Sequence, residues 1–389
     1  MRKVITGNYA AAYGAMLSRP AVVAAYPITP QTTIVELLAK FKAEGIADYK
    51  YIPVESEMAA ISACMGAELS GVRAYTATSA HGLLLMHEML HWVAGQRIPL
   101  VMNVANRALA PPWSVWADHQ DAIAQRDTGW MQIFAENNQE VLDSVIMGYK
   151  IAESHDILLP MIINMDAFIL THTLEVVDIP DQEMVDEFLP SFDLPHKIDL
   201  DNPRQYGTLA FPNQYMEFRY KMAQAMERAK SKIKEVAEEF KKKFGRYHGD
   251  LLDIYRIDGA DVVLITMGAL SSMGKEAVDI LREQGYNVGL IRLRTFRPFP
   301  TEDLRKYLKD VTVIGTIDRS YSFGYGGALF NEVKAALYGH SDVIVKDYIV
   351  GIGGRDISTE TMIKIFKNAI EIKKEGKLDR EIEWIDLNI

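Results

Sequence analysis

Cysteine is almost absent from this sequence. The only one among 389 residues, Cys64, lies in the run Ala60-Ile61-Ser62-Ala63-Cys64-Met65-Gly66-Ala67. A single thiol excludes a disulfide within the chain, and it also excludes an iron–sulfur cluster held by the chain's own thiolates, because such a cluster needs several cysteines. The small residues around Cys64, on an expected helix, favour a buried and inert thiol over a nucleophile.

Long hydrophobic runs and an excess of basic charge are also lacking. No uncharged stretch approaches the length of a membrane span, and Met1-Arg2-Lys3 is not followed by the apolar run that a signal peptide requires. The net charge of −10 argues against nucleic acid or an anionic membrane as a partner, since both need a concentrated basic face. With 49% hydrophobic and 24% charged residues, we expect a cytoplasmic, globular protein of roughly two to three domains.

Motifs for metals and for nicotinamide or flavin cofactors are incomplete. His87 and His91 are one helical turn apart, but the order His87-Glu88-Met89-Leu90-His91 differs from the zinc-protease motif, so no metal site is expected. The clusters Gly324-Tyr325-Gly326-Gly327 and Gly351-Ile352-Gly353-Gly354 lack the full dinucleotide fingerprint and the acid that should follow it. Tight turns are the favoured explanation for these glycines.

Strand and helix patterns alternate through most of the chain, which predicts an α/β fold with mostly parallel sheets. In the first part we expect strands at 21–25, 49–54, 72–77, 98–104 and 157–164, and helices at 33–41, 57–69 and 82–94. Prolines recur between 178 and 212, which indicates an extended segment over a surface, and a long amphipathic helix is expected at 213–244. A second α/β pattern begins near 258, with strands at 261–266, 288–293, 311–317 and 343–350 and a helix at 271–284.

The stretch Tyr26-Pro27-Ile28-Thr29-Pro30 joins the first of these strands to its helix. We predict that Thr29 is the N-cap and that Pro30 is the first helical residue, where its missing N–H costs nothing. Open α/β sheets bind ligands at the carboxyl ends of their strands, so the Thr29 hydroxyl is placed at a potential site. The alternative is an ordinary strand-to-helix turn.

Two charged residues follow other strands at the same predicted edge. Glu57 comes after Pro53-Val54-Glu55-Ser56 in the first turn of a helix, where capping by Ser56 or Glu57 is the alternative to a functional role. Arg107 ends Asn103-Val104-Ala105-Asn106-Arg107 and could bind a carboxylate with both arms of its guanidinium, or else form a surface salt bridge. Between them, Thr76-Ala77-Thr78-Ser79-Ala80-His81-Gly82 lines a third crossing with hydroxyl groups.

Two further segments carry unusual composition. The run Pro111-Pro112-Trp113-Ser114-Val115-Trp116-Ala117-Asp118-His119 is too aromatic for a solvent-exposed loop, and we interpret it as a lid or a subunit contact. The basic and aromatic segment 292–300 leads directly into a helix start at Thr301, and by itself it indicates an inter-domain turn.

Taken together, five motifs resemble the α subunit of 2-oxoacid:ferredoxin oxidoreductases, in particular the pyruvate and branched-chain members. The motifs are Tyr26-Pro27-Ile28-Thr29-Pro30, Glu55-Ser56-Glu57, Thr76-Ala77-Thr78-Ser79, Ala105-Asn106-Arg107-Ala108 and Phe296-Arg297-Pro298-Phe299-Pro300. The resemblance covers nearly the whole chain in order. It implies a thiamine-diphosphate-binding fold, with a pyrimidine-binding domain, extended segment and connecting helix over 1–255, and a transketolase C-terminal-like α/β domain over 256–389.

The resemblance also implies roles for individual residues. Glu57 would bind N1′ of the aminopyrimidine, Thr29 would face both substrate and aminopyrimidine, and Arg107 would hold the carboxylate of the 2-oxoacid. Thr78 and Ser79 would contact the cofactor. His81 stands where many relatives are expected to have glutamine, which leaves the part of the 78–82 loop in substrate choice open.

The implied activity is oxidative and reversible decarboxylation of pyruvate to acetyl-CoA and CO2 with reduction of ferredoxin; a branched-chain 2-oxoacid such as 2-oxoisovalerate is the alternative substrate. The chain has no Gly-Asp-Gly followed at a distance by Asn, so Mg2+ and the diphosphate are expected in a partner subunit, as are the [4Fe-4S] clusters. The implied partners are β, γ and δ subunits, ferredoxin, the 2-oxoacid and coenzyme A. A self-contained transketolase-like enzyme and a non-catalytic scaffold subunit are the rival interpretations.

Overall fold

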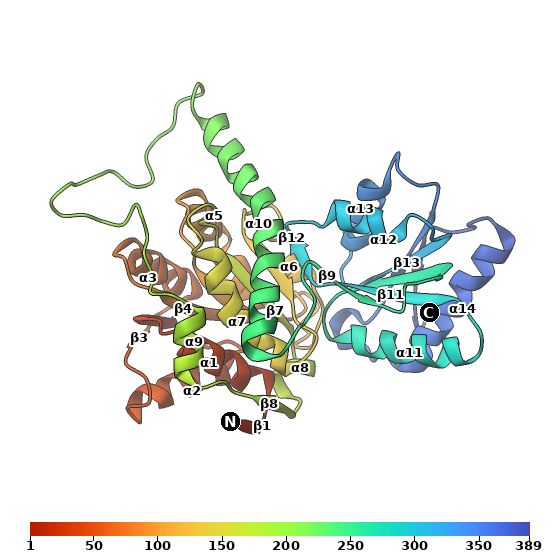
Figure 1. The fold of residues 1–389 in the computed structure, drawn as a ribbon, viewed down its shortest axis with the longest axis horizontal. Helices are drawn as coiled ribbons and strands as arrows, with labels where there is room; N and C mark the ends of the chain where they lie inside the picture. Colours follow the sequence, from red (N-terminus) through yellow and green to blue (C-terminus); the bar gives the residue numbers. More distant parts are fainter.

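The computed structural model describes all residues, 1–389, and contains two large sheets (Figure 1). The first sheet has seven strands in the order β12-β6-β7-β5-β4-β2-β3, and all neighbours are parallel except β12 with β6. Its strands are β2 (Val22–Ala25), β3 (Lys50–Pro53), β4 (Ala74–Ser79), β5 (Val101–Asn106), β6 (Met131–Phe134), β7 (Met161–Asp166) and β12 (Thr295–Arg297). The predicted α/β class is confirmed.

The second sheet has six strands in the order β15-β14-β13-β10-β11-β9. Its strands are β9 (Leu252–Tyr255), β10 (Val262–Thr266), β11 (Val288–Leu293), β13 (Val313–Asp318), β14 (Ile344–Ile349) and β15 (Ile382–Trp384). Only β9 is antiparallel to its neighbour. The helices of this part are η1 (Gly268–Leu270), α11 (Ser271–Glu283), α12 (Thr301–Leu308), α13 (Ala328–Leu337), η2 (Ile352–Gly354) and α14 (Thr359–Glu375).

A long helix, α10 (Tyr215–Phe244), runs along the first part of the molecule, and its N-terminal end projects together with the extended segment before it (Figure 1). The predicted helix at 213–244 is confirmed. The segment from 178 to 212 is extended as expected, except that α9 (Gln182–Phe188) lies within it. No helix is both long enough and apolar enough to cross a membrane.

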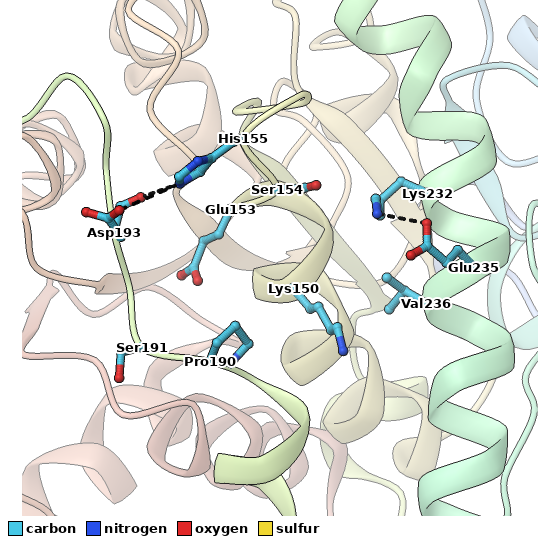
Figure 2. A pocket seen from close by; sticks show the side chains of 10 residues that line it. All are labelled: Lys150, Glu153, Ser154, His155, Pro190, Ser191, Asp193, Lys232, Glu235 and Val236. Atoms are coloured by element: carbon cyan, nitrogen blue, oxygen red, sulfur yellow. Dashed lines mark hydrogen bonds and ion pairs between the residues drawn. The ribbon is translucent and has the colours of Figure 1, made fainter.

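A polar hollow of the surface lies between α10, the end of helix α7 (Asn138–Ala152) and residues 190–193 (Figure 2). Its charged groups are matched within the chain: Lys232 contacts Glu235 at 2.8 Å, and Lys150 contacts Glu239 at 2.5 Å. His155 lies 4.0 Å from Asp193. Because each cation already has a carboxylate, this hollow offers no unpaired charge to a ligand.

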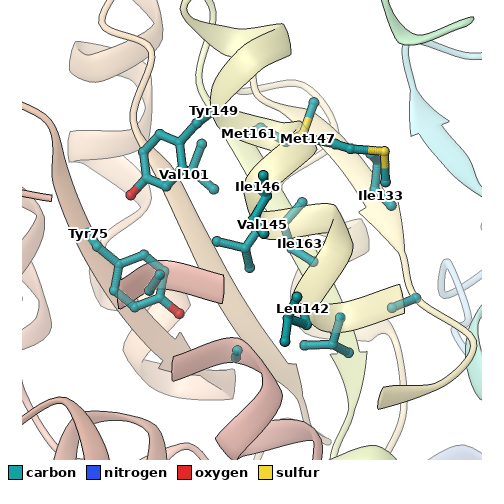
Figure 3. Packing of buried hydrophobic residues seen from close by; sticks show 14 of the residues in the cluster. Tyr75, Val101, Ile133, Leu142, Val145, Ile146, Met147, Tyr149, Met161 and Ile163 are labelled. Atoms are coloured by element: carbon teal, nitrogen blue, oxygen red, sulfur yellow. The ribbon is translucent and has the colours of Figure 1, made fainter. Parts of the chain in front are cut away.

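The central strands β4, β5 and β7 of the first sheet are buried along their whole length. Because side chains alternate between the two faces of a strand, both faces of the sheet carry buried side chains, and helices cover both. Val101 and Ile163 point to the face covered by α7, as Figure 3 shows, whereas Met102 and Ile162 point to the opposite face. The first face carries α1 (Gly7–Leu17), α2 (Thr32–Ala43), α7 and α10; the second carries α3 (Glu57–Leu69) and α5 (His87–Gly95).

Several predicted elements differ in detail from the structure. The helix expected at 82–94 is two helices, α4 (Ala80–Leu85) and α5, separated at Met86. Strand β6 and helix α7 were not predicted, although the apolar residues Val141, Leu142, Val145, Ile146 and Tyr149 of α7 recur at helical spacing. The smaller elements are β1 (Arg2–Ile5), which pairs with β8 (Glu175–Asp178), and the short helices α6 (Gln120–Ile123) and α8 (Ile169–His172).

The segment 292–300 is more than the inter-domain turn that the sequence indicates. Its residues 295–297 form β12, which leaves the second sheet after β11 and pairs with β6 of the first. Arg292 and Arg294 lie just before β12, and both donate to the buried carboxylate of Glu140 in α7, at 2.8 and 2.6 Å. Burial alone would raise the pKa of Glu140, but Arg292 and Arg294 outweigh burial and hold it at about 2.

Candidate active site

Four neighbouring strands bring the candidate residues to one edge of the first sheet. Strands β3, β2, β4 and β5 are adjacent and parallel, so their carboxyl ends lie together. Glu57 follows β3, Thr29 follows β2, and Arg107 follows β5. Thr78, Ser79 and His81 end β4 or begin the helix after it.

The turn after β2 differs from its sequence prediction. Neither Thr29 as N-cap nor Pro30 as first helical residue is correct, since α2 begins at Thr32 and is preceded by Gln31. The peptide bond between Thr29 and Pro30 is cis, and Gln31 fastens the turn to β4 by donating to the carbonyl of Ala77 at 2.6 Å. Thr29 is therefore left exposed at the edge, with its hydroxyl free of any cap bond.

Glu57 lies at the start of α3, as its position predicts. The capping alternative applies to Ser56, whose hydroxyl accepts from the backbone N–H of Ala59 at 3.2 Å. The Glu57 side chain is only 7% exposed and has no hydrogen-bond partner in the chain. The hydroxyl of Thr78 is likewise buried and unpartnered.

Gly82 brings these two groups together. A Cβ added at Gly82 would lie 2.4 Å from Thr78 Oγ1 and 2.6 Å from Glu57 Oε1, closer than any side chain can approach. Glycine at this position therefore allows the carboxylate and the hydroxyl to lie directly against the backbone of α4. Sequence reasoning did not single out Gly82, because only the packing of α4 against α3 gives it this role.

Ser79 is fully buried, and its hydroxyl donates to the carbonyl of Ala105 at 2.7 Å. This bond joins the ends of β4 and β5. Asp121 in α6 ties the same two strand ends, accepting from the backbone N–H groups of Ala80 and Arg107, each at 3.0 Å. Burial raises the pKa of Asp121 to about 7. No local pattern marked Asp121, which lies beyond the aromatic loop.

Arg107 is a buried cation without a carboxylate partner. Its side chain is 4% exposed, and its Nη1 donates to the backbone carbonyl of Thr29 at 2.5 Å. Its Nε is buried and has no partner. Burial lowers the pKa of the guanidinium from its usual value, and the nearby Asp121 opposes this shift. The surface salt bridge that the sequence left open is absent, so the guanidinium can receive an anion.

His81 lies against Arg107 and the loop that follows it. The His81 Nε2 accepts from the backbone N–H of Ala110 at 2.9 Å, and Nδ1 lies 3.3 Å from Arg107 Nη2. The aromatic loop 111–119 continues from Ala110 toward the second sheet, where Trp116 packs on Gly354 and Ser114 donates to the carbonyl of Gly353 at 3.3 Å. Trp113 remains 78% exposed.

The second part of the chain closes on this edge through a buried cluster. Asp166, at the end of β7, contacts Arg319 after β13 at 2.6 Å and His119 at 2.9 Å. Burial by itself would raise the pKa of Asp166, but Arg319 and His119 hold it well below its usual range. A charged network therefore fixes the relative positions of the two sheets next to the site.

The residues at the edge fit the aminopyrimidine end of thiamine diphosphate. The buried carboxylate of Glu57 and the buried, unpartnered hydroxyl of Thr78 can bind ring and exocyclic nitrogens, and Gly82 allows the two groups to lie close together. The unpaired guanidinium of Arg107 adds a site for an anion at the same edge. The arrangement therefore suits a cofactor with a nitrogen heterocycle acting on a small acid.

Comparison with known families gives two matches in chain order. Residues 13–238 match the family described as pyruvate flavodoxin/ferredoxin oxidoreductase, thiamine-diphosphate-binding, and residues 260–362 match pyruvate:ferredoxin oxidoreductase core domain II. The chain is 53% identical to ketoisovalerate oxidoreductase subunit VorA of Pyrococcus horikoshii, covering 100% of this chain and 98% of the relative. It is 48% identical to pyruvate synthase subunit PorA of Pyrococcus furiosus, with the same coverage.

Solved structures give the fold independently. A 2-oxoglutarate:ferredoxin oxidoreductase from Magnetococcus marinus matches with a TM-score of 0.73 and 18% identity, over 95% of this chain and 65% of that longer one. A split-gene transketolase matches with a TM-score of 0.56 and 12% identity, over 95% of this chain and all of that one. The expected thiamine-diphosphate-binding fold is thereby confirmed. From its fold and its full-length relatives, the chain belongs to the 2-oxoacid:ferredoxin oxidoreductase family.

Proposed function

We propose that this chain is the α subunit of a pyruvate:ferredoxin oxidoreductase, which converts pyruvate and coenzyme A to acetyl-CoA and CO2 with reduction of ferredoxin. The observation that carries the proposal is Arg107, a buried guanidinium with no carboxylate partner, at the same sheet edge as the buried carboxylate of Glu57. A non-catalytic scaffold would have no use for two uncompensated groups at one sheet edge, since each costs stability.

Each residue has a role in this proposal. Glu57 binds N1′ of the aminopyrimidine and holds a proton there, Thr78 binds the same ring through its free hydroxyl, and Thr29 faces the substrate. Arg107 holds the carboxylate of the 2-oxoacid and so orients the carbonyl. When bound, thiamine diphosphate supplies the nucleophilic carbon and the electron sink for decarboxylation. Ser79 was expected to contact the cofactor; because its hydroxyl donates to Ala105, we assign it instead the role of joining the ends of β4 and β5.

Partner subunits complete the enzyme in this proposal. We assign Mg2+ and the diphosphate to a partner subunit, because this chain has no Gly-Asp-Gly motif followed by Asn. The [4Fe-4S] clusters are also assigned to partner subunits, because this chain has a single, buried cysteine. The β, γ and δ subunits and ferredoxin are the proposed partners. The cofactor then lies at an interface, with its pyrimidine on this chain.

A branched-chain 2-oxoacid is the second candidate substrate. Three VorA relatives are 52–53% identical to this chain, whereas the PorA relatives reach 46–50%. Steady-state rates of the purified native complex on pyruvate, 2-oxoisovalerate and 2-oxoglutarate separate these candidates. The highest kcat/KM on pyruvate supports the proposal, and a clear preference for 2-oxoisovalerate assigns the second function.

The role of Glu57 is tested by Glu57→Gln in the assembled complex. We expect turnover to fall by at least about 100-fold, since the amide cannot hold the proton that general acid–base chemistry requires. The matched control is Glu55→Gln, an exposed carboxylate two residues away, which should leave turnover unchanged. Subunit composition by native mass spectrometry and thiamine diphosphate content are measured on both. Normal rates in an assembled Glu57→Gln complex would reduce Glu57 to a structural residue.

A further inference from the structure

The imidazole of His81 is held by a bond that fixes which of its nitrogens carries the proton. The backbone N–H of Ala110 can only donate, and it points at His81 Nε2 from 2.9 Å. A neutral imidazole has one N–H and one acceptor nitrogen. Because Nε2 is the acceptor, the proton of the neutral ring lies on Nδ1.

With this assignment, the contact between His81 and Arg107 joins two hydrogen-bond donors. His81 Nδ1 lies 3.3 Å from Nη2 of Arg107, which also can only donate. A bond between the two would require the lone pair of Nδ1, which the contact with Ala110 excludes in the neutral ring. His81 and Arg107 therefore present adjacent N–H groups that share no acceptor within the chain.

The remaining groups around Arg107 do not supply that acceptor. The carbonyl of Thr29 is bonded to Nη1, and Asp121 faces the backbone N–H of Arg107 and of Ala80 instead of the guanidinium. Arg107 Nε is buried without a partner. An oxygen of a bound anion beside Nη2 and Nδ1 would satisfy both donors at once.

We propose that His81 is a substrate-binding residue, whose Nδ1–H donates to the same 2-oxoacid carboxylate that Arg107 binds. The inference rests on the proposed function, since it takes the 2-oxoacid carboxylate as the anion at Arg107. It adds a neutral donor to the charged one, so that one carboxylate oxygen is held from two directions. His81 then restricts the orientation of the acid as well as its affinity.

The test is a set of His81 variants in the assembled complex. His81→Phe keeps a flat ring without either nitrogen, and His81→Ala leaves room for water; either one suffices if the other does not assemble. We expect KM for pyruvate, and Ki for the unreactive carboxylate oxamate, to rise about 10- to 100-fold, the range for one hydrogen bond to a charged group. KM for coenzyme A and the Kd of thiamine diphosphate should stay within about twofold. An unchanged KM and Ki, or an equal rise for coenzyme A, would overturn the inference.

His81→Gln is the conservative variant, because an amide offers one acceptor for Ala110 and one donor for the carboxylate, as the neutral ring does. It should bring KM for pyruvate back to within about threefold of the wild-type value. A rise as large as that of His81→Phe would count against the hydrogen bond to the substrate.

A double substitution separates substrate contact from support of Arg107. In an Arg107→Ala complex, His81→Phe should weaken oxamate binding by a further threefold or more. No further loss would show that His81 acts only through Arg107, and would overturn the direct contact while leaving the proposed function intact. If Arg107→Ala by itself leaves oxamate binding unchanged, the carboxylate site of the proposed function fails instead.

Discussion

The buried carboxylate of Glu140 should control the stability of the whole chain. It accepts from Arg292 at 2.8 Å, from Arg294 at 2.6 Å and from the backbone N–H of Glu136 at 2.9 Å. Glu140→Gln keeps the shape but removes the charge, and its amide nitrogen would face a guanidinium. Arg294 would then be buried without any carboxylate, since its other partners are the Asp250 carbonyl and the Ser144 hydroxyl.

The expected cost of Glu140→Gln is similar whether it is taken from the buried ion pair or from the shifted pKa. Removing one partner of a buried ion pair costs about 3–5 kcal/mol. A pKa lowered from 4.5 to about 2 corresponds to about 3 kcal/mol between the ionised and neutral forms. We therefore expect the variant to lose about 3 kcal/mol of unfolding free energy at pH 7.

The contribution of Glu140 to the free energy of unfolding should decrease as the pH falls. Because the pKa of Glu140 is lower in the folded state, its contribution is present above about pH 4.5 and is lost as the pH falls toward 2. Urea unfolding, followed by fluorescence and circular dichroism from pH 7 to pH 3, should show wild type and variant converging at low pH. The control Glu239→Gln removes a half-exposed partner of Lys150 and should cost no more than about 1 kcal/mol. A gap below 1 kcal/mol at pH 7, or one that stays constant with pH, would refute the reasoning.

Two further substitutions test the site. Gly82→Ala should lower thiamine diphosphate affinity and turnover at least tenfold, since its Cβ would lie 2.6 Å from Glu57 Oε1. The control Gly66→Ala, whose Cβ would have no atom within 4 Å, should leave both quantities unchanged, and equal effects in the two variants would contradict a special role for Gly82. Arg107→Ala should raise KM for the 2-oxoacid by about 30-fold or more, corresponding to about 2–5 kcal/mol, with little change for coenzyme A or ferredoxin, and Arg107→Lys should rescue it only partly because it lacks the planar fork. Equal weakening of all three substrates, or loss of assembly, would make Arg107 a structural residue.

The sequence predicted the positions of the site residues better than their local surroundings. Uninterrupted apolar strands such as β2 and β10 were recognisable. Because residues that follow parallel strands must meet at one edge, Glu57 and Arg107 were correctly placed at the same sheet edge. The turn at Thr29 was predicted wrongly, because the Gln31 side chain fastens it to Ala77, 46 residues away. Long-range contacts of this kind have no local pattern.

Long-range contacts also explain why two residues of the candidate site were not predicted at all. Asp121 and Gly82 owe their importance to contacts with residues of other elements, namely the backbone N–H groups that Asp121 accepts from and the side chains that lie against Gly82. The sequence around either residue contains no pattern that predicts these contacts. Packing between elements, which single-sequence periodicity cannot express, accounts for each of these omissions.

The crossing of β12 has a consequence for any attempt to divide this polypeptide. Strand β6 has β7 on one side and only β12 on the other, so a fragment that ends near residue 255 would expose a bare strand edge. Exposed edges of buried, apolar strands recruit other chains, and such a fragment should aggregate even if its remaining core is intact. The two halves would need to be produced together, with the second half donating its strand, as in complementation between separately encoded pieces of one protein.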